Sequence, residues 1–259
     1  MTETPTFPIA LLMMIVTSYM ALSGIETFGK WIVPSLFLVL LVVVFTVVLS
    51  LEKMDYSNFL PFLNTSPPEI LSSSYKLVTF PLAETVLFLT LMDAVKSKES
   101  PLKTFFFGIV IGCVVLLIIV LRNIAVIGSY NMNLMSFPSF SAAKVARLGN
   151  FLERIESSIS YNFIFAGVVK ISVCILAASK GIAHLFKIKN YRKIVIPTSV
   201  LIMALSCLSY KDYAEMINFI STYQIYAIPF EFAIPLFLWI FAEIRFRQKR
   251  KIARSTASV

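Results

Sequence analysis

Long runs of apolar residues, separated by short polar segments, dominate the pattern of this chain. A helix of about 20 apolar residues crosses the hydrocarbon core of a bilayer, so each run predicts a membrane-spanning helix. Seven runs have this character: residues 7–22, 31–51, 77–95, 104–126, 159–186, 194–210 and 222–244. The first of these runs is the shortest. The pattern therefore predicts an all-α polytopic membrane protein.

The composition agrees with this fold class. Hydrophobic residues make up 58% of the 259 positions and charged residues only 14%, a balance that water-soluble domains of this size do not normally show. The formal net charge of +9 does not indicate nucleic-acid binding, because the basic residues lie in short connections and in a tail rather than on one face. The three cysteines lie inside apolar runs and there is one histidine, so we expect no disulfide framework, no metal site and no cofactor.

The basic residues also predict the orientation of the spans. With seven crossings, one side of the membrane receives 14 of the 23 basic residues and the other receives seven. Basic residues concentrate in the cytoplasmic connections of membrane proteins. We therefore expect a cytoplasmic C-terminus with a basic tail at 245–259, and an N-terminus outside.

Two long connections are expected on the outer side. Residues 52–76 are predicted to form an irregular loop with a short helix at 56–63. In the second connection, 129–158, Ser141 is a suitable N-cap for an amphipathic helix lying on the membrane or over the mouth of the bundle. The apolar positions of that helix have helical spacing: Val145, Leu148, Leu152 and Ile155.

The run 77–95 combines a proline with a carboxylate three residues later, Pro81 and Glu84. Proline removes a backbone donor and frees a carbonyl, and an ionised side chain is costly at membrane depth. Such a segment persists only where protein or water satisfies its polar groups. Broken helices of this kind form ligand sites in transporters, so this segment is predicted to line a cavity.

Other ionisable residues also lie inside predicted spans. Lys170 falls in the middle of 159–186, where both a functional role and a snorkelling side chain are open. Glu231 lies between Pro229 and Pro235, which allows a wet kink or a pairing with a neighbouring helix. Lys180 is nearer a helix end and is predicted to snorkel.

Motifs for hydrolysis or phosphoryl transfer are absent from the sequence. The chain has no glycine-rich phosphate loop, no GxSxG elbow and no HExxH pair. We therefore expect a protein that is not an enzyme.

Several motifs closely resemble those of spore germination permeases, the B subunits of bacterial nutrient germinant receptors. The outer connection reads FPSFSAA at 137–143 and GNFLERIE at 149–156. The following span reads KIS at 170–172 and AASKGIA at 177–183, similar to the eighth helix of that family. The segment FPLAET at 80–85 is similar to its sixth-helix motif, except that the family usually has glycine where Ala83 stands.

This resemblance implies the fold of the amino acid-polyamine-organocation superfamily, a leucine-transporter-like bundle of two inverted five-helix repeats. Family members have ten helices, whereas this chain has seven predicted runs. The first run matches the fourth helix of the family, so the three N-terminal helices are expected to be missing. In that register, 7–51 holds two helices of the first repeat and 77–244 holds all five of the second, in a single membrane domain over 1–259.

The resemblance also implies a site and partners. In that fold, ligand lies between the unwound stretches of the first and sixth helices, with walls from the third, eighth and tenth. The residues that remain of the pocket are implied to be Thr79, Phe80, Pro81, Leu82, Ala83 and Glu84, with Lys170 and Glu231 nearby. The implied ligand is a small nutrient such as an amino acid, and the implied partners are the A and C receptor subunits in the spore inner membrane.

Two other interpretations stay open from the sequence. The same broken helix suits a secondary transporter of an amino acid, in which Lys170 replaces a coupling cation by titrating a proton. The absent helices also suit a truncated fragment without function. We expect the chain to lie in the lipid bilayer and to bind no nucleic acid.

Overall fold

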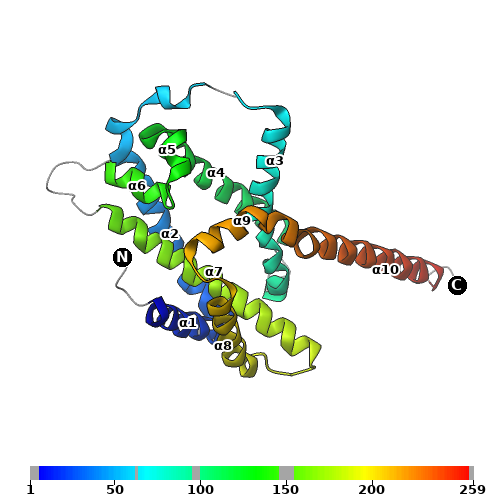
Figure 1. Cartoon of the computed structure of the whole chain (residues 1–259). Coiled ribbons are helices and arrows are strands. Elements are labelled where there is room, and N and C mark those ends of the chain that lie inside the picture. The colour runs from blue at the N-terminus through cyan, green and yellow to red at the C-terminus, as the bar shows by residue number, and fades with distance from the viewer. Residues whose placement is uncertain (1–5, 62–63, 95–99, 146–154, 257–259) are drawn as a thin grey trace. The chain divides into compact units, whose positions relative to one another are not determined.

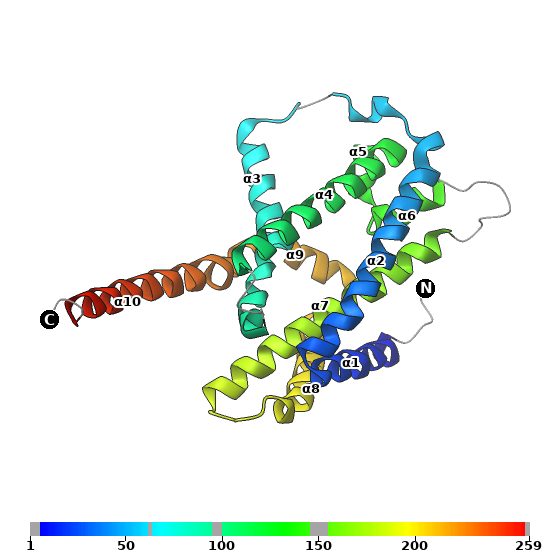
Figure 2. The same cartoon turned by 180° about the vertical axis from the view of Figure 1, so that it is seen from behind.

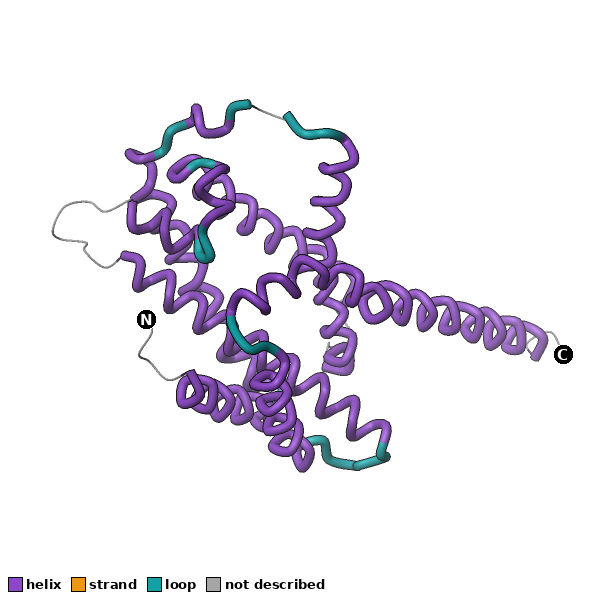
Figure 3. The backbone as a smooth tube through the Cα atoms, viewed as in Figure 1, coloured by secondary structure: helices purple, strands orange, loops and turns teal. Residues whose placement is uncertain are grey.

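The computed structural model describes residues 6–61, 64–94, 100–145 and 155–256, and every regular element within these ranges is a helix (Figure 3). Six of the described helices are long and apolar enough to cross a bilayer, which confirms an all-α polytopic membrane protein. The first predicted span corresponds to a shorter apolar helix, Phe7–Ser23.

The chain divides into two compact units. The first comprises Met1–Asn64 and Thr90–Leu205. Its elements are α1 (Thr6–Ser23), α2 (Ile25–Ser50), 3₁₀ helices over Leu51–Lys53 and Tyr56–Phe59, α4 (Pro101–Ile127), α5 (Ser129–Leu134), α6 (Pro138–Val145), α7 (Ile155–Leu185) and most of α8 (Arg192–Ser209) (Figure 1).

The second unit comprises Thr65–Leu89 and Ser206–Val259. It holds α3 (Pro67–Leu77), a π-helical segment Val78–Leu82, and most of a 3₁₀ helix Ala83–Ala94. It also holds α9 (Tyr213–Ile228), a second π-helical segment Pro229–Ala233, and α10 (Ile234–Thr256). Figure 1 shows α9 continuing directly into α10.

Helices α1 and α7 pack against each other and lie side by side in both views (Figures 1 and 2). Thr17 and Ser179 are fully buried, and the Met13 methyl group lies 3.5 Å from where a Cβ of Gly167 would stand. The Thr17 hydroxyl donates to the Met13 carbonyl at 2.8 Å. Small residues let membrane helices approach closely, and such back-bonding satisfies a hydroxyl without a partner on the other helix.

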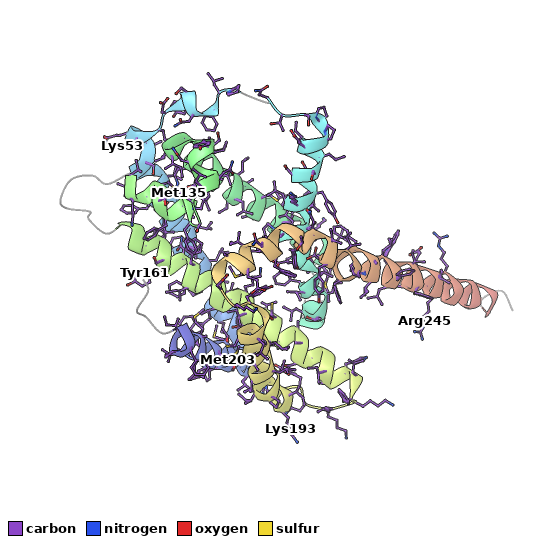
Figure 4. The ribbon with its side chains drawn as sticks, in the orientation of Figure 1. Lys53, Met135, Tyr161, Lys193, Met203 and Arg245 are labelled. Atoms are coloured by element: carbon purple, nitrogen blue, oxygen red, sulfur yellow. The ribbon has the colours of Figure 1, made fainter. Side chains whose placement is uncertain are left out.

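Large apolar side chains cover the outer surface of the long helices. Trp31 and Phe37 on α2 are 57% and 69% exposed, and Tyr161 on α7, labelled in Figure 4, is 61% exposed. Apolar surface on this scale is unfavourable in water and favourable in lipid. The distribution of side chains therefore supports a multi-pass membrane protein.

A single glycine connects α1 to α2. Gly24 has φ +85°, and a Cβ at this position would lie 3.2 Å from Arg192 Nη2. Glycine alone adopts this conformation without strain and leaves this space. Because the turn is so tight, α2 begins at Ile25 and includes Lys30, which was expected to lie in a connection before a span starting at residue 31.

The segment 67–76, predicted to be irregular, is helical. Helix α3 begins at Pro67 because Ser66 and Glu69 form a capping box, in which the Ser66 amide donates to Glu69 Oε2 at 3.2 Å. Two prolines occupy the first helical positions, where a missing N–H has no cost. The polar composition of this segment favoured a loop, although the capping box that starts α3 is present in the sequence.

The short helix expected at 56–63 is a 3₁₀ helix over Tyr56–Phe59. Asp55 caps it, because its carboxylate accepts from the Ser57 amide at 2.9 Å. Hydrogen bonds from the Ser57 side chain and backbone lower the pKa of the Asp55 carboxyl below its usual value. Residues 62–63 lie outside the described residues.

Ser141 is not the N-cap that the sequence suggested. Helix α6 begins three residues earlier, at Pro138, and the Ser141 amide already donates to the Phe137 carbonyl at 3.1 Å. Proline is favoured in the first turn because its φ is preset for a helix. The predicted continuation through Leu148 and Leu152 lies outside the described residues.

The last helical region starts earlier and ends later than the predicted run 222–244. Helix α9 begins at Tyr213, where Asp212 accepts from the Glu215 amide at 2.8 Å. Helix α10 continues to Thr256, so the basic segment expected to be a tail is helical as far as the described residues reach. On α10 the i,i+4 pair Arg247 and Glu243 forms an ion pair at 2.9 Å.

Candidate functional site

The helical region that begins with α3 is interrupted at Phe80, inside the π-helical segment Val78–Leu82. Phe80 has φ −131° and ψ 117°, an extended conformation between two helical stretches. Proline disfavours the helical conformation of the residue before it and cannot donate to the helix, so Pro81 accounts for the break. The prediction of a broken helix at this point is confirmed.

The residues before and after the break differ in exposure. Thr79 is fully buried, and its hydroxyl donates to the Tyr75 carbonyl at 2.8 Å. Phe80 is 42% exposed. Beyond the break, the side chains of Pro81, Leu82, Ala83 and Glu84 are half-buried. A 3₁₀ helix follows from Ala83, and such a stretch inside a longer helix often marks a functional hinge.

A second interruption lies in the same unit, between α9 and α10. The segment Pro229–Ala233 is π-helical and contains Glu231. Single π-helical turns are rare and frequent at functional sites. The kink expected from Pro229 and Pro235 therefore takes the form of a widened turn around a half-buried carboxylate.

Tyr223 on α9 connects the two interruptions. Its ring packs edge-on against Phe80, with centroids 6.0 Å apart and planes at 79°. Its hydroxyl donates to Glu231 Oε1 at 3.1 Å. Tyr75, one turn before the break, donates through its hydroxyl to the Gln224 carbonyl at 3.3 Å. The structure thus brings the break and Glu231 together through one helix.

Aromatic rings continue along α9 beyond this contact. Phe219 packs against Tyr223 at 6.3 Å and against Tyr226 at 6.0 Å, and Tyr226 packs against Phe230 at 5.7 Å. Aromatic pairs in such tilted or edge-on geometries add about 0.5–1.5 kcal/mol beyond burial. These ring pairs, within α9 and the segment that directly follows it, stabilise the helix that contacts both interruptions.

Tyr223 and Tyr75 were not among the residues that the sequence suggested. No local pattern distinguishes Tyr223 from the other tyrosines, since its role depends on which helices pack together. The one available signal was its spacing of eight residues before Glu231, across Pro229.

Lys170 belongs to the other unit. It lies on α7 and its side chain is exposed at the surface of the chain. Its membership of the same site as Phe80 and Glu231 stays a prediction.

Lys180, predicted to snorkel, forms a hydrogen bond within the protein. Its Nζ donates to the Thr90 carbonyl at 3.1 Å, inside the first unit. A carbonyl oxygen has two lone pairs and accepts a second donor in addition to its helical one. This side chain is therefore directed at the Thr90 carbonyl.

Metal ions need sets of donor side chains that converge on one point. Among the described residues, no group of three or more histidine, cysteine, aspartate or glutamate side chains converges. The chemistry that the interruptions offer is hydrogen bonding and aromatic contact, from Tyr223, Glu231 and the backbone around Phe80.

The long apolar helices define a multi-pass membrane protein, and two of its helical regions are interrupted and linked through Tyr223. The family model described as "Spore germination protein" matches residues 1–214. The chain therefore belongs to the spore germination permease family.

One curated relative is the "Spore germination protein KB" of Bacillus subtilis (strain 168). It is 25% identical over 262 residues, which cover 96% of this chain and 68% of the relative. No solved structure matches the chain.

Proposed function

We propose that this chain is the nutrient-sensing subunit of a spore germinant receptor, and that a small nutrient such as an amino acid binds at the broken segment around Phe80. The observation that carries the proposal is the double contact of Tyr223, with Phe80 at the first interruption and with Glu231 at the second. Backbone that is freed from helical bonds supplies donors and acceptors for a polar ligand. Thr79, Pro81, Leu82, Ala83 and Glu84 complete the proposed ligand-binding segment.

The proposed mechanism is a shift between conformations, without catalysis. A ligand moves such an equilibrium only as far as its affinities for the two states differ, and a change from 1:99 to 99:1 needs about a 10⁴-fold difference. The two π-helical segments are the proposed moving parts, because both contact α9. The signal then passes to A and C subunits, with the C-terminus of this chain on the cytoplasmic side.

The proposal is tested by germination of spores that lack this chain. We expect the response to at least one amino acid, measured as loss of optical density, to disappear and to return when the gene is restored. Unchanged germination with every amino acid, sugar and nucleoside tested would remove the proposed role.

The alternative function is secondary transport of an amino acid, favoured by the same broken helix. In that case Lys170 is proposed to take the place of a coupling cation. Uptake into proteoliposomes that is lost in Lys170→Ala would favour transport. Absence of uptake under any imposed gradient, together with intact nutrient binding, would favour sensing.

A further inference from the structure

Arg122 and Asn123 form a buried polar pair near the end of α4, in the first unit. Their side chains are 4% and 3% exposed. Each makes a contact with Ser139 on α6: Arg122 Nη1 donates to its carbonyl at 3.4 Å, and Asn123 Nδ2 donates to its hydroxyl at 3.0 Å. The two side chains therefore converge on one residue of the helix that packs against α4.

The hydrogen bonding of this pair is incomplete. Arg122 Nε and Asn123 Oδ1 are both buried without a hydrogen-bond partner. Arg122 forms no ion pair with any residue in the described ranges. Burying a guanidinium costs several kcal/mol unless an anion and further hydrogen bonds compensate. A carbonyl at 3.4 Å is a long, uncharged partner and does not supply that compensation.

The neighbouring surface does not supply an anion either. The buried side chains that α6 presents are Ala142 and Ala143, at 0% and 1% exposure. The end of α4 is satisfied separately, since the Asp55 amide and Asn58 Nδ2 both donate to the Ala125 carbonyl, at 2.9 and 3.0 Å. A purely structural contact with Ser139 would need only a neutral donor. No anion among the described residues compensates the charge of Arg122.

We propose that Arg122 and Asn123 form a subsite for a small carboxylate that also carries a hydrogen-bond donor, such as an α-amino acid. With Nη1 directed to Ser139, the Nε and Nη2 edge of the guanidinium remains for a carboxylate, which it matches with two parallel bonds. Asn123 Oδ1 accepts from the ammonium group of the same molecule. The subsite does not rest on the proposed function, because Phe80, Tyr223 and Glu231 belong to the other unit.

The test is thermal unfolding of the purified full chain in neutral detergent with glycine, acetate, acetamide or inorganic phosphate. A ligand that binds only the folded state raises the unfolding midpoint progressively, with the logarithm of its concentration once the site is nearly saturated. We expect stabilisation by glycine at lower concentration than by acetate, and none by acetamide, which has the same shape without the charge. Equal effects of acetamide, or a larger effect of phosphate than of acetate, would overturn the assignment.

Substitutions of Arg122 test whether the stabilisation by glycine arises from binding at this pair. Arg122→Gln is expected to abolish stabilisation by glycine. Arg122→Lys, which keeps the charge but loses the fork, is expected to raise the required glycine concentration about tenfold. The matched control is Lys144→Gln, an exposed cation on α6 that lies over the Phe140 ring at 4.7 Å and should leave the response unchanged.

A lower midpoint in Arg122→Gln with an undiminished response to glycine would mean that the pair only fastens α6, and would overturn the proposal. If Arg122→Gln does not fold, the ligand series on the unmodified chain and the Arg122→Lys variant decide the matter. The unfolding measurements on the unmodified chain and on its variants do not involve germination. The proposed subsite can therefore be refuted without refuting the proposed function, and the reverse.

Discussion

Replacing Tyr223 with phenylalanine is expected to raise the nutrient concentration for half-maximal germination by about tenfold or more. The substitution removes the hydroxyl that donates to Glu231 Oε1 at 3.1 Å and keeps the ring that packs against Phe80. A hydrogen bond to a charged group contributes about 1.5–3 kcal/mol, and 1.4 kcal/mol corresponds to a factor of ten. The measurement is the rate of optical-density loss across a nutrient titration.

The matched control for this prediction is Tyr226→Phe. Tyr226 lies one turn later on α9 and is 60% exposed. Its contacts described above are made by its ring, with Phe219 and Phe230. It should shift the titration little. Glu231→Gln should reproduce the Tyr223→Phe shift, since it removes the charge from the same bond. Equal shifts in the two tyrosine variants would show that the contact with Glu231 has no special role.

Leu176→Ala is expected to destabilise the first unit by about 2–5 kcal/mol. Leu176 is 1% exposed on α7, next to the fully buried Ile175. In lipid, helices associate through packing more than through the hydrophobic effect, so the loss comes mainly from contacts that the new cavity removes. The measurement is thermal unfolding in detergent, with the amount of chain in membranes as a second readout.

The control for the packing prediction is Ile164→Ala on the same helix, where the side chain is 51% exposed. Because that side chain faces outward, its truncation leaves no cavity and should change the unfolding midpoint only slightly. A similar loss of stability in both variants would mean that α7 is not held by the buried face described here.

Local signals in the sequence predicted the elements that depend on local physics. Apolar length identified the spans, because the bilayer fixes the number of residues that a helix needs. Pro81 predicted the break at Phe80, because proline restricts its own position and the one before it. The start of α3 was equally local, yet the capping box of Ser66 and Glu69 lay in a polar stretch that was interpreted as a loop.

The remaining features depend on tertiary packing. Tyr223 became part of the candidate site only when α9 was found against both interruptions. Lys180 found a carbonyl 90 residues away, which no periodicity reveals. The pairing of Arg122 with Ser139 likewise arises from the approach of α6 to α4. Residue type could point to Glu231 as unusual but not to its partner.

The most direct test of the central claim is equilibrium binding of the germination-active nutrient, in radiolabelled form, to membranes that contain this chain with its receptor partners. Binding at the broken segment predicts saturation in the concentration range that triggers germination. It also predicts about tenfold weaker binding in Tyr223→Phe, with Tyr226→Phe unchanged. Absence of saturable binding, or equal affinity in wild type and Tyr223→Phe, would contradict the claim that the nutrient is sensed at this site.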